Sequence, residues 1–311
     1  MLVPRREFLG GLGLTAFALA TPRPLLPGAE SRTRLVLLGT AGGPTPKRSH
    51  AAPAQVVLVD DDAYVVDCGD GVARQLALAG VALSRIRAVF ITHQHSDHNA
   101  GYGSLLLLAW DAGLAPTLHT YGPPPLARMT GLVADMNAYD IETRIRDEGL
   151  PPFAGLVAAH EITAAGPVLQ RGGVKVKAAL VEHPPVAPAF AYRFDTPDRS
   201  IVFSGDTAPS ESLVALAKGA DVLVHEALYV PGIEGLLARN PQATRLRQHL
   251  LASHTPTTEL GRIAAAAGVK TLVLSHFVPG DDDTITDEMW TRGVRDRFGG
   301  EVIVGKDLMV L

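Results

Sequence analysis

The sequence predicts an α/β fold in which two β-sheets pack face to face and helices cover the outer side of each sheet. Each half of the chain alternates short apolar, β-branched runs with helical patterns. Several of the predicted strands end in histidine or aspartate. With 311 residues and 47% hydrophobic content, the chain can bury a large core, and no long linker divides residues 31–311. We therefore expect a single domain over residues 31–311.

Residues 1–30 have the composition of an export signal and linker. Arg5 and Arg6 form a twin-arginine pattern, a mildly apolar run covers residues 11–20, and residues 18–20 (Ala-Leu-Ala) offer a small-x-small cleavage site. The apolar run is too short to span a bilayer, so no stable membrane anchor is expected. The pattern predicts a periplasmic or secreted protein exported by the twin-arginine route; the alternative is a disordered N-terminus.

The first half of the domain begins with a strand and a tight glycine turn. Residues 34–38 are mostly apolar. Residues 39–44 (Gly-Thr-Ala-Gly-Gly-Pro) include three glycines, whose lack of a side chain allows another segment to approach the backbone closely. The acidic turn 60–62 is expected to be a solvated hairpin tip. Further strands are predicted at 56–59, 63–66, 86–91 and 117–121, with helices at 71–80, 105–110 and 126–147. The segment 126–147 should cover the pocket mouth or form a subunit contact.

The second half repeats this alternation of strands and helices. Strands are predicted at 174–181, 189–194, 200–203, 221–224 and 270–275, with helices at 210–217 and 257–267. Gly268 ends the second of these helices, as glycine commonly does after a last helical turn. The repetition of the pattern predicts two sheets.

The stretch that follows the strand 86–91 carries most of the predicted chemistry. Residues 93–98 are His-Gln-His-Ser-Asp-His. The tip of a strand that ends this way must curl, so that three imidazoles and a carboxylate can point into one small volume. Such mixed ligands suit zinc, iron or manganese rather than calcium or magnesium. Four ligands fill only part of the coordination shells of two metals, so further histidines and aspartates are expected at later strand ends.

Three later strand ends carry such residues. His183 follows the strand 174–181, Asp206 follows the strand 200–203 and a glycine, and His276 follows the strand 270–275. With these blocks in this order, the chain resembles the metallo-β-lactamase fold hydrolases over almost its whole length after residue 30. The resemblance implies the four-layer αβ/βα sandwich of that family.

The resemblance also implies a set of metal ligands and a reaction. Three histidines would hold one metal, an aspartate and two histidines would hold a second, and one carboxylate would bridge them. In this sequence the ligands of the first metal are His93, His95 and His183, those of the second are Asp97, His98 and His276, and the bridge is Asp206. Two Zn²⁺ per chain are expected, with iron or manganese as alternatives. A water shared by the two metals would become hydroxide and attack an ester without a nucleophilic side chain.

Two further motifs resemble the ribonuclease Z branch of the family. His225 lies in Val-His-Glu-Ala (224–227), where we expect it to hydrogen-bond behind a metal ligand. His254 lies in Ser-His-Thr (253–255), where the histidine of the family aids the departing group or holds the scissile oxyanion. The predicted catalytic residues are His254 and Asp97. The alternative for His254 is a place beside the cap of the following helix.

The remaining histidines and the single cysteine are expected to play no part in the chemistry. His50 and His249 lie in polar, loop-like surroundings and are expected to be exposed, whereas His119 and His160 lack partners at ligand spacing. With Cys68 alone, the chain can form neither an intramolecular disulfide nor a multi-cysteine zinc site. The strand-end context of Cys68 predicts a buried structural thiol.

Particular residues narrow the choice of branch. The carboxylate of Asp206 argues against the β-lactamases, and His95 argues against the flavodiiron oxidoreductases, which carry glutamate there. Only 35 residues follow His276 (311 − 276 = 35), too few for the helical domain of glyoxalase II. With these classes excluded, the motifs around His225 and His254 favour the branch that contains ribonuclease Z and the zinc-dependent arylsulfatases.

Within that branch, the sequence predicts a small-molecule ester as substrate. Ribonuclease Z carries a long RNA-gripping arm between the third histidine and the bridging aspartate, whereas here 23 positions separate His183 from Asp206 (206 − 183 = 23). The net charge of −4 provides no basic field for nucleic acid, and an exported protein would not meet tRNA. We therefore expect a dinuclear zinc hydrolase of aryl sulfates that binds no nucleic acid and, like its branch, forms a homodimer.

Two alternatives to the arylsulfatase remain. The first is a phosphodiesterase, acting on small or cyclic nucleotides or in the manner of ribonuclease Z, because the same metal centre would serve it. The second is a non-catalytic metal-binding protein that kept the fold. In the leading interpretation, residues 110–147 and the loop at Pro184 and Pro185 form an apolar pocket wall that suits a compact aromatic ester.

Overall fold

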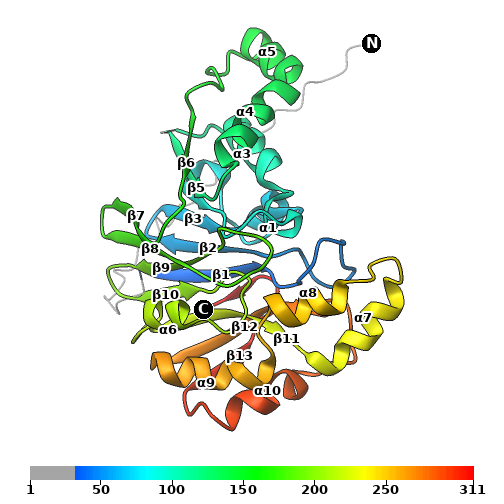
Figure 1. Ribbon diagram of the computed structural model, residues 1–311. Helices are drawn as coiled ribbons and strands as arrows, with labels where there is room; N and C mark the ends of the chain where they lie inside the picture. Colours follow the sequence, from blue (N-terminus) through cyan, green and yellow to red (C-terminus); the bar gives the residue numbers. More distant parts are fainter. Residues whose placement is uncertain (1–31, 116) are drawn as a thin grey trace, which may run out of the picture. The chain divides into compact units, whose positions relative to one another are not determined.

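The computed structural model describes residues 32–311 except residue 116. The predicted twin-arginine signal and linker, residues 1–30, lie outside the described residues. Within the described part of the chain, the strands form two sheets of seven strands each (Figure 1). No helix in that part is long and apolar enough to cross a membrane.

The first sheet has the strand order β14-β1-β2-β3-β4-β5-β6. Strands β14 to β3 in this order pair antiparallel, and β3 to β6 pair parallel. Its strands are β1 (Thr33–Gly39), β2 (Ala54–Val59), β3 (Asp62–Val66), β4 (Ile86–Phe90), β5 (Leu118–Gly122), β6 (Val157–Glu161) and β14 (Met309–Val310). Parallel neighbours need a crossover, and helices α1 (Val72–Leu78) and α3 (Tyr102–Asp111) provide two of them.

The second sheet has the same mixed design, in the order β13-β12-β11-β10-β9-β8-β7. Strands β13 to β10 pair parallel, and β10 to β7 pair antiparallel. Its strands are β7 (Gly166–Arg171), β8 (Val174–Leu180), β9 (Phe190–Asp195), β10 (Ser200–Phe203), β11 (Val222–Leu228), β12 (Thr271–Val278) and β13 (Glu301–Val304). Helices α6 (Glu211–Leu216), α9 (Thr257–Ala267) and α10 (Asp287–Arg295) bury their apolar sides against it.

Successive residues of the strands face different layers of the core. In β1, Leu35 and Leu37 belong to the core between the two sheets, whereas Val36 and Leu38 belong to the core under helices α1 and α3. Between the sheets, the rings of Phe90 and Phe194 meet edge to face with centroids 5.1 Å apart. Burial of each such large side chain contributes about 1.5–3 kcal/mol. The layers are helix, sheet, sheet and helix, which confirms the predicted four-layer sandwich.

Several elements lie in segments for which the periodicity of apolar residues predicts neither a helix nor a strand. These are β6, β7, β13, α10 and the helices α7 (Ile233–Arg239) and α8 (Leu246–Ser253). Strands β6 and β7 lie at sheet edges with partly exposed side chains, so they lack a clear alternation of apolar and polar residues. The predicted helix 126–147 is two helices, α4 (Leu126–Met136) and α5 (Ala138–Asp147), which meet at Asn137.

Candidate metal centre and its cavity

The structure brings all seven predicted metal ligands together at the ends of strands from both sheets. His93 and His95 follow β4, and Asp97 and His98 lie on the short helix α2 (Ser96–Asn99). The other three ligands are His183 after β8, Asp206 after β10 and His276 within β12. That these residues bind metal stays a prediction, which the geometry below supports.

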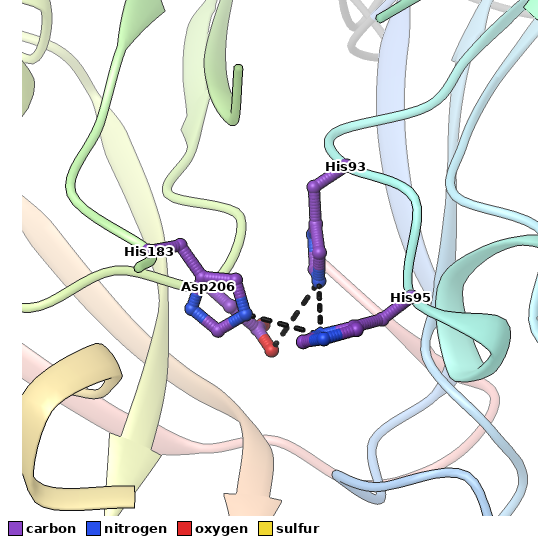
Figure 2. A group of neighbouring side chains, drawn as sticks. All are labelled: His93, His95, His183 and Asp206. Carbon is purple, nitrogen blue, oxygen red and sulfur yellow. Dashed lines mark hydrogen bonds and ion pairs between the residues drawn. The ribbon is translucent and has the colours of Figure 1, made fainter. Parts of the chain in front are cut away.

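Four of the ligands form the first group (Figure 2). Nε2 of His93 and Nε2 of His183 each lie 3.1 Å from Nδ1 of His95. Oδ2 of Asp206 lies 3.9 Å from Nε2 of His93. Ligand nitrogens at about 2.0–2.1 Å from a tetrahedral zinc are roughly 3.3–3.4 Å apart. The spacing within this group therefore fits an ion of that size.

The same carboxylate oxygen belongs to a second group. Oδ2 of Asp206 lies 3.4 Å from Nε2 of His98 and 3.2 Å from Nε2 of His276. Oδ2 of Asp97 lies 3.6 Å and 3.3 Å from the same two nitrogens. Because Asp206 faces both groups, the arrangement offers two metal positions that share one carboxylate.

Unpaired buried atoms support the fit of a metal to these groups. Nε2 of His98 and Oδ1 of Asp206 are buried and have no hydrogen-bond partner in the described part of the chain. Each unpaired polar atom of this kind costs about 1–3 kcal/mol, and coordination would remove that cost. Burial lowers the pKa of His93 well below its ordinary value, which keeps that imidazole in the neutral form that binds metals.

The backbone of β12 places His276 by means of a bulge. Ser275 pairs with Glu226 and Phe277 pairs with Ala227, so His276 is an extra residue in the ladder, with a φ of 44°. The predicted strand ended at 275, but β12 continues to Val278 because the bulge lets pairing resume. A Cβ at Gly42 would lie 2.8 Å from Cε1 of His276, which explains why the predicted glycine turn is bare.

Asp67 is a residue of the site that the sequence analysis missed. It follows β3 with a φ of 59°, and its carboxylate accepts a hydrogen bond from the backbone N–H of Thr92 (2.8 Å). Its Oδ2 lies 2.8 Å from Nδ1 of His98. The sequence signal for Asp67 was its position directly after an apolar strand, because several of the predicted ligands also come directly after a strand.

A second buried pair lies beside the ligands. Oε2 of Glu226 lies 3.3 Å from Nδ1 of His254, and Oε1 accepts a hydrogen bond from the backbone N–H of Thr255 (2.6 Å). Nδ1 of His254 is 4.0 Å from Oδ2 of Asp206, and no residue in the described part of the chain hydrogen-bonds to Nε2 of His254. Burial lowers the pKa of His254 to about 4. His254 is therefore close enough to contact a substrate group that is bound next to Asp206.

The other histidines differ in part from expectation. His225 is buried, and its Nδ1 lies 2.8 Å from the carbonyl oxygen of Glu226 rather than beside a ligand side chain. His119 and His160 stand outside the site and contact each other, with Nδ1 of the first 3.0 Å from Nε2 of the second. His50 is partly exposed. His249 was expected to be exposed, but it is half-buried, and its ring lies 5.7 Å from that of His95. Helix α8, which carries His249, lies in a segment for which the sequence predicts no element.

A cavity of about 360 Å³ is lined by four of the predicted metal ligands, His95, Asp97, Asp206 and His276. Its walls come from the glycine turn and Lys47, from helices α7 and α8, and from residues 278–281. The prediction that residues 110–147 form the wall is wrong. Trp110 is buried in the core and donates a hydrogen bond to the carbonyl oxygen of Pro151, and helices α4 and α5 do not line this cavity. Residues of α7 and α8, including Leu236 and Leu250, provide the apolar part of the wall instead.

Comparison with known sequences supports the family suggested by this geometry. Residues 63–277 match the family described as the beta-lactamase superfamily domain. A curated relative from Mycobacterium bovis strain BCG, named ribonuclease Z, is 35% identical over 277 residues, which cover 88% of this chain and 96% of the relative.

Solved structures share the fold. A metallo-beta-lactamase fold protein, YhfI from Bacillus subtilis, superposes with a TM-score of 0.66 at 24% identity, over 90% of this chain and 98% of its own. The short form of human tRNase Z superposes with a TM-score of 0.65 at 21% identity, over 89% of this chain and 98% of its own.

Proposed function

This chain belongs to the metallo-β-lactamase superfamily, and we propose that it is a metal-dependent phosphodiesterase of the ribonuclease Z type that cleaves RNA. The observation that carries the proposal is the buried pair of His254 and Glu226 beside two ligand groups that share Asp206. A phosphodiester with an alcohol leaving group needs such a proton donor. The name of the M. bovis relative, which this chain matches over 96% of its length, favours the same function.

The prediction of an aryl sulfate substrate and of no binding to nucleic acid is wrong, because the similar curated proteins are named ribonuclease Z. That prediction relied on net charge, on the short interval between His183 and Asp206, and on the expected export, which would keep the protein from tRNA but not from all RNA. Net charge is a sum over the whole chain, whereas a phosphate responds mainly to charges within about 8–10 Å at physiological salt. At the site, Lys47 lines the main cavity and Arg245 lines a neighbouring one.

Each ligand group would hold one ion, which supports our proposal of two Zn²⁺ per chain, with iron or manganese as alternatives. His93, His95 and His183 would hold one ion, Asp97, His98 and His276 would hold the other, and Asp206 would join both. When bound, the ions would lower the pKa of a water molecule and neutralise charge on the phosphoryl oxygens.

The residues of the chain then move the protons. As the water oxygen bonds to phosphorus, Asp97 accepts the proton of the water. The bond from phosphorus to the leaving alcohol breaks, and His254 donates the proton that the alcohol needs. Because the pKa of His254 is low in the free protein, its protonation depends on the negative charge of the bound phosphate. Glu226 holds the ring in place at 3.3 Å.

The experiment that tests this function compares ester classes on one zinc-loaded preparation. We expect cleavage of short RNAs, loss of that cleavage with a chelator and its return with added zinc. Turnover of aryl sulfates should be at least about tenfold lower in kcat/KM, a gap of roughly 1.4 kcal/mol in transition-state binding. Aryl sulfate turnover without RNA cleavage would contradict the proposal.

We also propose that residues 31–311 form the mature domain and that residues 1–30 direct export by the twin-arginine route. Arg5 and Arg6 support this proposal, because a receptor reads that pair and not its charge alone. Replacement of both by lysine should leave the protein in the cytoplasm on fractionation. A normal periplasmic level in the double variant would refute the assignment.

A further inference from the structure

A second cavity adjoins the metal centre and has no part in the steps above. It measures about 600 Å³, and we call it the side groove. Its walls include His95, Pro184, Pro185, Arg245, Gln248 and His249. His95 and His249 also line the main cavity, so the two cavities meet along these two rings.

Hydrogen bonds hold the two walls of the side groove together. One wall is the loop that follows His183, and the other is helix α8. Nδ1 of His183 lies 2.9 Å from the carbonyl oxygen of Ser253, and the Ser253 hydroxyl donates to the carbonyl oxygen of Pro184. Nδ1 of His249 lies 3.3 Å from the same hydroxyl. Since His183 is a predicted ligand, these bonds position the groove relative to the metal centre.

The chemistry of the side groove suits a nucleotide. Among the residues that the structure describes, Arg245 is the one Lys or Arg that lines the side groove, and no carboxylate lines it. Within residues 32–311, Arg245, the residue before α8, forms no ion pair, whereas Arg247 in α8 pairs with Glu234. A free guanidinium can bind a phosphate through two parallel hydrogen bonds. The exposed rings of Pro184 and Pro185 offer an apolar surface for a base.

We propose that the side groove binds the RNA segment that keeps the phosphate after cleavage. This inference rests on the proposed function. His254 lines the main cavity but not the side groove, so the leaving segment, which receives its proton, lies in the main cavity. The segment that keeps the phosphate contacts His95 and His249, and the next phosphate along that segment binds Arg245. The place of His249 between the two cavities is thereby explained.

The test uses p-nitrophenyl esters of 2′-O-methyl uridylates that are one and three nucleotides long, prepared as 5′-phosphates and as 3′-phosphates. Nitrophenol is the leaving group in every case, so the nucleotides form the segment that keeps the phosphate. In one of the two series, lengthening should raise kcat/KM of the native zinc-loaded protein at least tenfold. Arg245→Ala should reduce this ratio to about threefold or less, and Arg247→Ala should preserve it. A ratio taken within each variant cancels any general loss of metal or folded protein.

Equilibrium binding gives a second readout that does not need turnover. The phosphorylated trinucleotide of the active series, labelled for fluorescence anisotropy, should bind Arg245→Ala about five- to tenfold more weakly than the native protein or Arg247→Ala. A length effect that is missing in the native protein, or that survives Arg245→Ala, would overturn the inference alone. No nitrophenol release from any diester would overturn the proposed function and the inference with it.

Discussion

Oδ2 of Asp67 lies 2.8 Å from Nδ1 of His98, and both side chains are buried. The contact leaves Nε2 of His98 facing Asp97 and Asp206. A carboxylate behind a ligating imidazole holds the orientation of the ring and raises its basicity. Asp67 also accepts hydrogen bonds from Thr92, so it ties the strand tip and the second ligand group into one unit.

Asp67→Ala should weaken metal binding at the second ligand group about 10- to 100-fold, since His98 loses the partner that orients it. Isothermal titration calorimetry of the metal-free protein with zinc measures this change in affinity. Asp70→Ala alters an exposed carboxylate in the same turn and should leave both affinities unchanged. Equal affinities in the native protein and Asp67→Ala would show that the contact does not support the metal.

Asp206→Ala should lose metal from both ligand groups together, because Oδ2 of Asp206 faces both of them. Elemental analysis should give two metal ions per native chain and fewer than one in the variant, with RNA cleavage lost in parallel. One ion or none in the intact native protein would contradict the two-metal arrangement.

His254→Ala should keep both metals while the rate of RNA cleavage falls about 10²- to 10⁴-fold, the usual range for a lost proton donor or oxyanion contact. The fall should be smaller for p-nitrophenyl diesters, because nitrophenolate needs little protonation. Equal falls for both leaving groups would indicate oxyanion stabilisation instead. Unchanged rates would show that His254 has only a structural role next to the N-cap of α9.

Asp221 should make folding stability depend on pH far from the metal centre. Burial alone would raise its pKa, but hydrogen bonds from Lys270 and Ser200 lower it to about 2. A pKa depressed on folding adds stability above the unfolded value near 3.8, and this stability is lost as the pH falls toward about 2.

Asp221→Asn should therefore reduce the free energy of unfolding by about 1–2 kcal/mol at pH 7. The difference from the native protein should shrink progressively below pH 4. Urea unfolding of the metal-free proteins at several pH values measures it, with exposed Asp147→Asn as control. A difference that stays constant down to pH 2 would contradict the role of the ionised carboxylate.

The family, the four-layer fold and the seven side chains that the structure brings together could be predicted from the sequence because their signals are local. A strand followed by His-Gln-His-Ser-Asp-His is a continuous pattern, and His183 and Asp206 each come directly after an apolar run. Successive side chains of β1 enter the two core layers in turn, and this alternation is also a property of neighbouring residues.

The parts of the site that the sequence did not reveal depend on contacts between distant segments. Asp67 and His98 are 31 positions apart. The extra residue in β12, His276, is recognised only when β11 is aligned beside it. The substrate class was also mispredicted, because net charge says nothing about which cations border a cavity.

By itself, then, the sequence determined which side chains are available for chemistry and at which strand ends they lie. Only the tertiary structure decided that α7 and α8, rather than residues 110–147, wall the main cavity, and that His95, His249 and Arg245 line the side groove together. The physical reason is that a strand end follows from local burial and backbone preference, whereas the wall of a cavity depends on how separate helices pack against the sheets.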